Sequence, residues 1–289
     1  LRLFRDIARE MSFVRAATQN HISQPAVSMQ IRKLEESLNK KLFVRTPHNI
    51  QLTPEGRMIL PDVKKILSLS DGLKRKFDDS EGIVEGDIRV AAIHSIGMYE
   101  IGEMLSSFMK AYPKVHLHLE YQRSDAIYER LLKEKIDLGL VAYPEKRTRV
   151  EVIHYGYDEL VLITANEHPL SVKKSIQLSQ IAGEAFIAFD EGIPTREATD
   201  RLLKAQEVSI DLRMTNDNIY TLKKAVEAGV GISIVPSSAV EEEVQQGSVK
   251  CLRIRGVNTQ RELAMIKLRN KEPNRPLKKF IETMLLSGK

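Results

Sequence analysis

The sequence predicts a multi-domain α/β protein, because three features of the chain point in that direction. Its 289 residues exceed one small module and suit two domains of roughly 100–200 residues each. The first part of the chain has the apolar spacing of short helices. From about residue 87 onward, strand-like and helix-like segments alternate, which is typical of sheets with parallel strands and right-handed crossovers.

The composition excludes several classes of protein. Hydrophobic residues make up 42% of the chain and charged residues 29%, as in ordinary soluble proteins, which argues against disordered or fibrous proteins. No apolar run is long enough to span a membrane, and no signal peptide opens the chain. The single cysteine, Cys251, excludes an intramolecular disulfide, so we expect a reducing, cytoplasmic location.

The positive charge is concentrated near the N-terminus. The formal net charge is +5, and residues 1–60 hold ten Lys/Arg against five Asp/Glu, so this segment carries the whole excess. A basic end on a neutral body is typical of a nucleic-acid-binding head. A chance asymmetry of a solvated surface is equally consistent with so small an excess.

Three short helices are expected in this basic segment. The first carries Leu3 and its neighbours, Ser12 is a plausible N-cap of the second, and Ser23 is a plausible N-cap of the third. Pro25 lies in the first turn of the third helix, where a missing N–H costs little. That helix is expected to run to about Asn39. Its apolar stripe consists of Val27, Ile31, Leu34 and Leu38.

The opposite face of the third helix carries side chains that suit DNA. Two helices joined by a tight turn form a helix-turn-helix, whose second helix enters the major groove with its N-terminal residues toward the bases. Gln24 can address adenine, Arg32 guanine or phosphate, and Ser28 either a base or a phosphate. From the pattern alone, a helical bundle without a DNA role remains equally consistent.

Two strand-like segments follow and predict a hairpin. Residues 42–45 and 50–53 have strand character, and residues 46–49 read as a turn. Such a hairpin would form a wing beside the helix-turn-helix. Arg45 and Thr53 would then lie near the DNA backbone.

A heptad pattern marks residues 54–79 as a connecting helix. A narrow stripe has little to bury against within one chain, so we expect a homodimeric coiled coil, with a core helix as the alternative. Gly82 and Gly86 then mark a domain boundary. The apolar stripe consists of Ile59, Val63, Ile66, Ser70, Leu73 and Phe77.

The remaining chain predicts two similar α/β units with a cleft between them. Strands are expected at residues 87–93, 115–120, 137–142, 159–164, 185–189, 210–214 and 232–235. Helices are expected at residues 99–111, 125–133, 195–205 and 218–228. In such folds, small molecules bind beyond the carboxyl ends of the strands, at helix N-termini.

The segments at those strand ends identify the candidate cleft. They are residues 94–97, 142–144, 190–196 and 215–218. Their hydroxyls, amides, backbone N–H groups and one arginine suit a small polar or anionic ligand. As an alternative, Ser95, Thr195 and Asn218 serve only as helix caps.

No catalytic or metal-binding motif appears. The chain lacks a G-x-S-x-G elbow, a P-loop and an H-E-x-x-H helix, and Gly229-Val230-Gly231 reads as a turn. We expect His116 and His118 to face solvent from a strand, and Cys251 to be an unreactive strand residue. An enzyme, a metal site and a bound cofactor are therefore not expected.

Several runs of residues closely resemble the LysR-type transcriptional regulators. At the N-terminal end these are residues 13–17, 23–35, 42–45 and 52–56, and this helix-turn-helix signature is highly specific. Later landmarks are residues 137–141, 168–170, 228–231 and 235–236. The resemblance covers essentially the whole chain.

The resemblance implies a fold and a way of working. It implies a winged helix-turn-helix over residues 1–57, a linker and dimerisation helix over 58–86, and an effector-binding domain over 87–289. That domain would be similar to periplasmic solute-binding proteins, with one lobe of residues 87–163 and 266–289 and another of residues 164–265. Family members are usually tetramers that bind interrupted inverted repeats near promoters and change DNA bending when a metabolite enters the cleft. RNA polymerase is a further possible partner.

The resemblance and the residue chemistry together name three sets of positions. The expected DNA-binding residues are Ser23, Gln24, Pro25, Ser28, Met29, Arg32, Arg45 and Thr53, although the family often has arginine where this chain has Met29. The expected effector-binding residues are His94, Ser95, Ile96, Gly97, Tyr143, Gly192, Thr195, Arg196, Asn216 and Asn218. The expected dimerisation residues are Ile59, Val63, Ile66, Leu73 and Phe77.

We therefore predict a cytoplasmic, homo-oligomeric, DNA-binding regulator that a small metabolite switches. The alternative is a small-molecule-binding protein of the solute-binding type, with an N-terminal module that serves only for oligomerisation.

Overall fold

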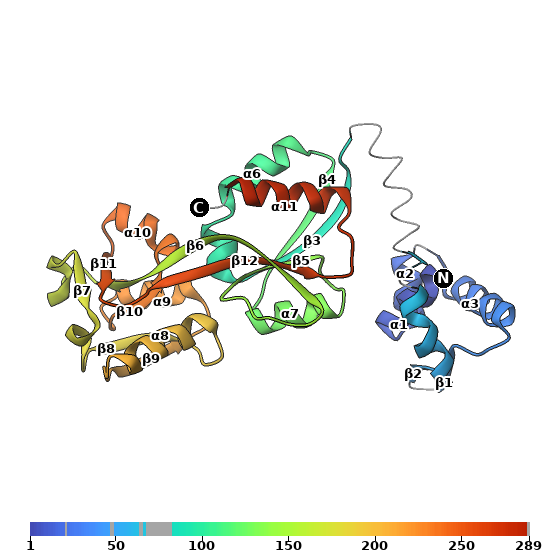
Figure 1. Ribbon diagram of the computed structural model, residues 1–289, viewed down its shortest axis with the longest axis horizontal. Coiled ribbons are helices and arrows are strands. Elements are labelled where there is room, and N and C mark those ends of the chain that lie inside the picture. The colour runs from blue at the N-terminus through green and yellow to red at the C-terminus, as the bar shows by residue number, and fades with distance from the viewer. Residues whose placement is uncertain (21, 47–48, 64–65, 68–82, 288–289) are drawn as a thin grey trace. The chain divides into compact units, whose positions relative to one another are not determined.

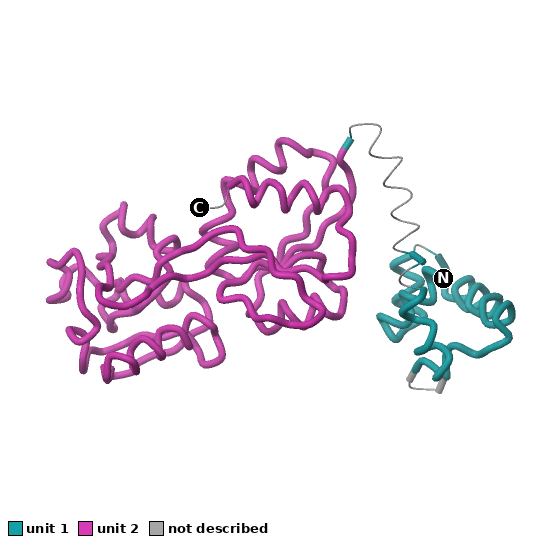
Figure 2. Tube along the Cα trace, viewed as in Figure 1, with its two compact units in different colours: residues 1–83 teal, residues 84–289 magenta. Residues whose placement is uncertain are grey.

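The computed structural model describes residues 1–20, 22–46, 49–63, 66–67 and 83–287. The chain divides into two compact units, residues 1–83 and residues 84–289 (Figure 2). The predicted domain boundary near Gly82 and Gly86 lies at this division.

The first unit begins with three helices and a hairpin. They are α1 (Arg2–Glu10), α2 (Phe13–Gln19), α3 (Gln24–Leu38), β1 (Phe43–Thr46) and β2 (Asn49–Leu52). Ser12 caps α2 by accepting from the backbone N–H of Arg15 at 3.2 Å, and Ser23 caps α3 by accepting from that of Ala26 at 3.4 Å. Both predicted caps are confirmed. Residues 54–63 and 66–67 are helical.

The core of this unit is aromatic at its centre. The ring of Phe43 on β1 lies 5.4 Å from that of Phe4 on α1 and 5.7 Å from that of Phe13 on α2. Val27 and Ile31 bury the inner face of α3 as predicted, but Leu38 is 45% exposed. The apolar stripe of α3 therefore ends before the last turn of the helix.

The second unit consists of two lobes. Lobe one has a sheet in which β3 (Gly86–Ala92) pairs in parallel with β4 (Val115–Tyr121) and β5 (Leu138–Ala142). β12 (Gln260–Leu268) then pairs antiparallel with β5 and with β6 (Val150–Thr164). The sheet is thus mixed, whereas the sequence predicted parallel strands throughout.

Helices cover both faces of this sheet (Figure 1). On one face α6 (Gly102–Ala111) packs against α11 (Arg275–Ser287), with the rings of Phe108 and Phe280 5.1 Å apart. On the other face α7 (Ser124–Leu132) buries Ile127 and Tyr128.

Lobe two is built on the continuation of β6. Its last part pairs antiparallel with β10 (Ser233–Pro236) and β11 (Lys250–Arg255), and β11 pairs in parallel with β7 (Ser175–Gln177). A separate parallel pair, β8 (Ala185–Phe189) and β9 (Asp211–Asn216), leads into helices α8 and α9. The helical segments of this lobe are η1 (Pro169–Val172), η2 (Leu178–Ile181), α8 (Pro194–Ala205), α9 (Ile219–Glu227), η3 (Ser237–Val240) and α10 (Glu241–Gln246).

Three differences from the predicted elements matter for the site. A short helix, α5 (His94–Tyr99), occupies the segment expected to be a loop. β6 begins at Val150 rather than at residue 159. Leu160 of β6 already packs in the core of lobe two, and Leu263 of β12 packs in that of lobe one, so the chain changes lobe earlier than residues 164 and 265.

Candidate functional site

The exposed face of α3 carries the predicted DNA-reading residues. Gln24, Pro25 and Arg32 are exposed, Ser28 is half-buried, and Met29 is 55% exposed. Because Ser23 caps the helix with its side chain, its hydroxyl already has a partner within the chain. The face is thus open to a partner at the N-terminal end of the helix, where DNA contacts of this motif lie.

A buried carboxylate fastens the hairpin to α3. Glu35 accepts from the backbone N–H groups of Leu42 at 2.9 Å and Phe43 at 3.4 Å, and from the Lys41 ammonium at 2.9 Å. Burial acts to raise the pKa of Glu35, but these donors outweigh it and hold the pKa below its ordinary value. Glu35 therefore fixes where the hairpin begins relative to α3.

The side chain of Thr53, a predicted DNA-backbone contact, is already hydrogen-bonded within the chain. Its side chain is buried: Oγ1 donates to the carbonyl of Lys41 at 2.7 Å and accepts from the N–H of Gly56 at 2.9 Å. Threonine here starts the next helix by capping it. Arg45 pairs with Ile50 across the antiparallel strands β1 and β2, so the predicted hairpin is present and Arg45 lies on it.

The predicted dimer stripe is only partly available for a second chain. Val63 is buried in the core of the first unit, and Ile59 packs against that core, as the core-helix alternative expected. Ile66 is 51% exposed. Ser70, Leu73 and Phe77 lie outside the described residues.

A small cavity lies where the two lobes meet, and we call it the helix-end cavity. Its volume is about 50 Å³. The lining residues come from both lobes: Ile93, His94, Ser95, Gln122, Arg123, Ser124, Ala142, Phe189, Gly192, Ile193, Pro194, Thr195, Asp217 and Ile219.

Three helices of nine or more residues begin at this cavity. The first residues of α7, α8 and α9 are Ser124, Pro194 and Ile219, and all three line it. The short helix α5 also starts there, at His94. Helix N-termini carry unpaired N–H groups and a partial positive charge. The arrangement can therefore bind a small anion.

Some predicted effector residues line the cavity and others do not. His94, Ser95, Gly192 and Thr195 line it. Ser95 and Thr195 are buried, and neither is the N-cap of its helix, so the capping alternative is wrong for both. The predicted residues that do not line it are Ile96, Gly97, Tyr143, Arg196, Asn216 and Asn218.

The structure gives several of these other residues internal partners. Asn218 caps α9, accepting from the N–H of Tyr220 at 2.9 Å, which the capping alternative anticipated. Asn216 accepts from the N–H of Asn218 at 2.9 Å. The Arg196 guanidinium donates to Asp200 and to the Phe189 carbonyl at 2.8 Å.

The sequence interpretation missed the cationic side chain of the cavity. Arg123 comes directly before α7, and its Nη2 donates to the carbonyl of Glu191 in the other lobe at 3.1 Å. It also lies near Gly192, whose added Cβ would be 3.3 Å from Nη2. Because Arg123 follows the second strand of the lobe, a prediction that included every strand end would have found it.

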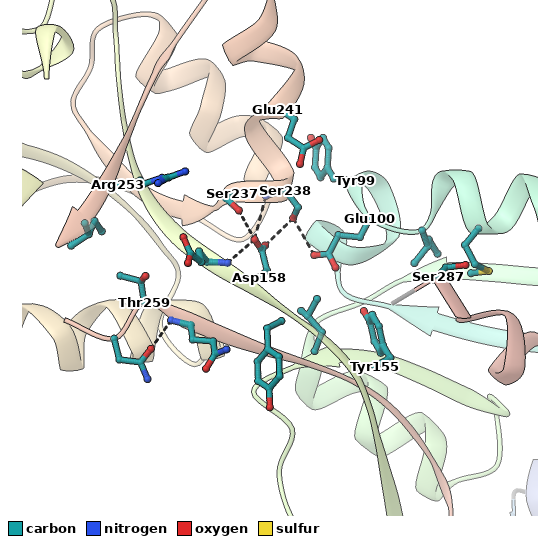
Figure 3. A pocket seen from close by; sticks show the side chains of 18 of the residues that line it. Tyr99, Glu100, Tyr155, Asp158, Ser237, Ser238, Glu241, Arg253, Thr259 and Ser287 are labelled. Atoms are coloured by element: carbon teal, nitrogen blue, oxygen red, sulfur yellow. Dashed lines mark hydrogen bonds between the residues drawn. The ribbon is translucent and has the colours of Figure 1, made fainter. Parts of the chain in front are cut away.

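A buried network extends from the cavity into the protein. The Arg261 side chain on β12 is fully buried, and its Nη2 donates to Ser95 Oγ at 2.5 Å. Its Nη1 donates to Glu100 and Asp158, each at 3.4 Å. Asp158 also accepts from the hydroxyl of Ser238 at 2.8 Å, which ties η3 of lobe two to this network (Figure 3).

The two histidines and the cysteine that the sequence analysis singled out have no role in either site. His116 and His118 are exposed on β4, as predicted. Cys251 is half-buried on β11, and burial raises the pKa of its thiol, which disfavours the reactive thiolate. Within the described ranges, no group of three His, Cys, Asp or Glu side chains is placed to hold a metal, and no helix there is both long and apolar enough to cross a membrane.

Comparison with known proteins matches both units. Residues 1–57 match the bacterial regulatory helix-turn-helix proteins of the lysR family, and residues 82–287 match the LysR substrate binding domain. A probable RuBisCO transcriptional regulator of Trichormus variabilis is 32% identical over 291 residues, covering 99% of this chain and 86% of that protein.

Solved structures share the fold. A full-length OxyR variant from Pseudomonas aeruginosa has a TM-score of 0.77 at 23% identity, covering 99% of this chain and 96% of that one. The CcmR regulatory domain of Synechocystis, solved in complex with 2-PG, has a TM-score of 0.66 at 24% identity, covering 71% of this chain and 98% of that one.

The match over residues 1–57 decides between the alternatives of the sequence analysis. It identifies the N-terminal unit as a DNA-binding module rather than one that serves only for oligomerisation. The relatives are regulators of transcription, not enzymes. The chain belongs to the LysR family of bacterial transcriptional regulators.

Proposed function

We propose that this regulator binds an interrupted inverted repeat at promoters as a homo-oligomer, and that a small anion in the helix-end cavity changes how it bends that DNA. The observation that carries the proposal is the meeting of the N-termini of α7, α8 and α9 with the Arg123 guanidinium at one cavity. Among the described residues that line the cavity, Asp217 alone has a carboxylate.

The size of the cavity supports a mechanism in which the lobes move. About 50 Å³ is far below the ~300–1,000 Å³ of typical ligand sites, so a metabolite would have to move the lobes apart to bind there. The hydrogen bond from Arg123 to Glu191 bridges the two lobes there. A ligand anion would compete for the same guanidinium, and it would shift the lobes because it binds one arrangement better than the other.

The DNA part of the proposal is tested by selection from a randomised DNA pool. The full-length chain is titrated with the pool at several salt concentrations, followed by anisotropy, and the bound fraction is sequenced. We expect an enriched inverted repeat and a steep loss of affinity with salt. A bound fraction with no enriched sequence would contradict sequence-specific binding.

The effector part is tested by thermal unfolding of the full-length chain at constant ionic strength. The probes are acetate, malonate, citrate and inorganic phosphate. We expect at least one of them to raise the melting temperature of the wild type and to have little effect on Arg123→Gln. Arg213→Gln, which changes an exposed arginine on β9 outside the cavity, should respond like the wild type. Equal responses of the wild type and Arg123→Gln would overturn the proposed site.

A further inference from the structure

An exposed methionine lies on the outward face of α3. Met29 is 55% exposed, so the core of the first unit does not hold its side chain. It lies two positions from Val27 and two from Ile31, and both of these are buried. Because each residue of an α-helix turns by about 100°, Met29 is on the opposite side of the helix from both of them. The side chain therefore faces directly away from the core.

The neighbours of Met29 identify this face as the one that meets DNA. Pro25 is exposed one turn before it, and Arg32 and Lys33 are exposed one turn after it. Other side chains form the ion pairs among the described residues of the first unit, so these two cations are available to DNA. The N-terminal part of the second helix of a helix-turn-helix lies against the base edges. Met29 is the sixth residue of α3, within that part.

The chemistry of methionine restricts which base it can face. Its thioether has no N–H or O–H group to donate and is only a weak acceptor. The polar edges of guanine, cytosine and adenine would lose water against it without gaining a good hydrogen bond, which is unfavourable. The C5-methyl group of thymine is the apolar feature of the major groove, and an apolar side chain gains free energy by covering it.

We infer that Met29 is a specificity-determining residue that reads thymine, by covering the C5-methyl group of one thymine in each half-site. The inference rests on the sequence-specific DNA binding proposed above, and it adds both the residue and the base. Gln24 and Arg32 are suited to hydrogen bonds with bases, whereas Met29 supplies an apolar contact. Its unbranched, flexible side chain can adjust to the position of the methyl group.

The test removes the methyl group from the DNA. The operator comes from the selection described above, and each thymine of one half-site is replaced in turn by deoxyuridine, which lacks only the C5-methyl group. Anisotropy titrations of the full-length chain at constant salt give the ratio of the dissociation constants with and without the methyl group. We expect one thymine whose replacement weakens binding about fourfold, which corresponds to the loss of one buried methyl group.

A substitution then assigns that methyl group to its partner. Met29→Ala shortens an exposed side chain, so it should leave the melting temperature unchanged and abolish the effect of deoxyuridine at that thymine. The effects at other thymines should persist. Met58→Ala is the matched control, because Met58 is 70% exposed in the same unit but lies outside α3, and it should keep the wild-type ratio.

A second variant tests the identity of the base. Selection repeated with Met29→Arg should enrich guanine at that base pair, because arginine bonds the O6 and N7 atoms of guanine. If the wild type enriches a repeat but no deoxyuridine effect depends on Met29, or if Met29→Arg selects the wild-type sequence, this inference alone is wrong. If the wild type enriches no repeat, the proposed sequence-specific binding fails together with it.

Discussion

Arg261 and Ser95 are joined by a hydrogen bond of 2.5 Å, from the guanidinium Nη2 to the serine Oγ, although 166 positions separate them in the chain. Ser95 lines the helix-end cavity, and Arg261 also bonds Asp158, which lines a second, larger cavity of about 810 Å³ between the lobes. One fully buried side chain thus contacts a wall of each cavity. A ligand that displaces the Ser95 hydroxyl must therefore also disturb Arg261.

Loss of the Arg261 guanidinium should strongly destabilise the second unit. Arg261→Met leaves Glu100 and Asp158 buried without that cation, and breaking a buried ion pair in this way costs about 3–5 kcal/mol. Urea denaturation measures the loss. Adding Asp158→Asn removes one of the carboxylates and should recover part of the stability; a double variant less stable than Arg261→Met would contradict this electrostatic account.

Ser95→Ala should uncouple the effector from the DNA response. The change removes the acceptor of Arg261 Nη2 and a buried hydroxyl of the helix-end cavity, while the first unit is unaffected. Operator affinity without effector should equal that of the wild type, and the change in affinity on adding the anion should be lost. Loss of operator binding itself would argue against a role in the cavity.

Arg32→Ala and Thr53→Ala should separate a DNA contact from a structural cap. Arg32 is exposed on α3, so its replacement should leave the melting temperature unchanged and cost roughly 1–3 kcal/mol of specific binding. Thr53→Ala removes a helix cap and should cost about 0.5–2 kcal/mol of stability. If Arg32→Ala lowers only the salt dependence of DNA affinity and leaves the sequence preference unchanged, Arg32 contacts a phosphate instead of a base.

Gly56→Ala should destabilise the first unit through a steric clash. An added Cβ would lie 2.3 Å from the carbonyl oxygen of Leu42, so the helix that contains Gly56 must move away from the segment that precedes β1. Gly102→Ala is the matched control in the second unit, because its Cβ meets nothing within 4 Å. Thermal unfolding should show a lower melting temperature for Gly56→Ala and no decrease for Gly102→Ala.

Acid should loosen the hairpin of the first unit through Glu35. The pKa of this carboxyl is lowered in the folded chain, so its contribution to stability is complete above the ordinary value of 4.5 and disappears as pH falls through the lower folded pKa. Hydrogen exchange at the N–H groups of Leu42 and Phe43 should report the change. In Glu35→Gln these amides should exchange faster than in the wild type at neutral pH. Their protection from exchange should also change less than in the wild type when the pH is lowered.

Local signals made much of the fold predictable. Ser12 and Ser23 are caps whose side chains act within three residues, and β3, β5 and α7 have apolar patterns that correspond to their burial. α5 was missed because it has no side-chain cap and only six residues. The early start of β6 was missed because residues such as His154 and Tyr157 are exposed there, which interrupts the buried pattern.

The site was harder to predict because it depends on contacts between distant segments. Ser95 and Thr195 were found as cavity residues because both follow strand ends in the predicted order of strands and helices. The bond from Arg123 to Glu191 and the network around Arg261 join segments that only the folded chain brings together. The cap formed by Thr53 was also missed, because its hydroxyl bonds the Lys41 carbonyl, twelve positions away in the chain.

The strand β6 also restricts how this protein can evolve. Leu160 and Leu162 pack in one core of lobe two, while the residues between and after them, Val161 and Ile163, pack in another. Deleting a single residue upstream in the same strand would exchange these two sets of side chains between the cores. Relatives should therefore differ in length at the surface turns of the lobes, whereas β6 should keep a constant length.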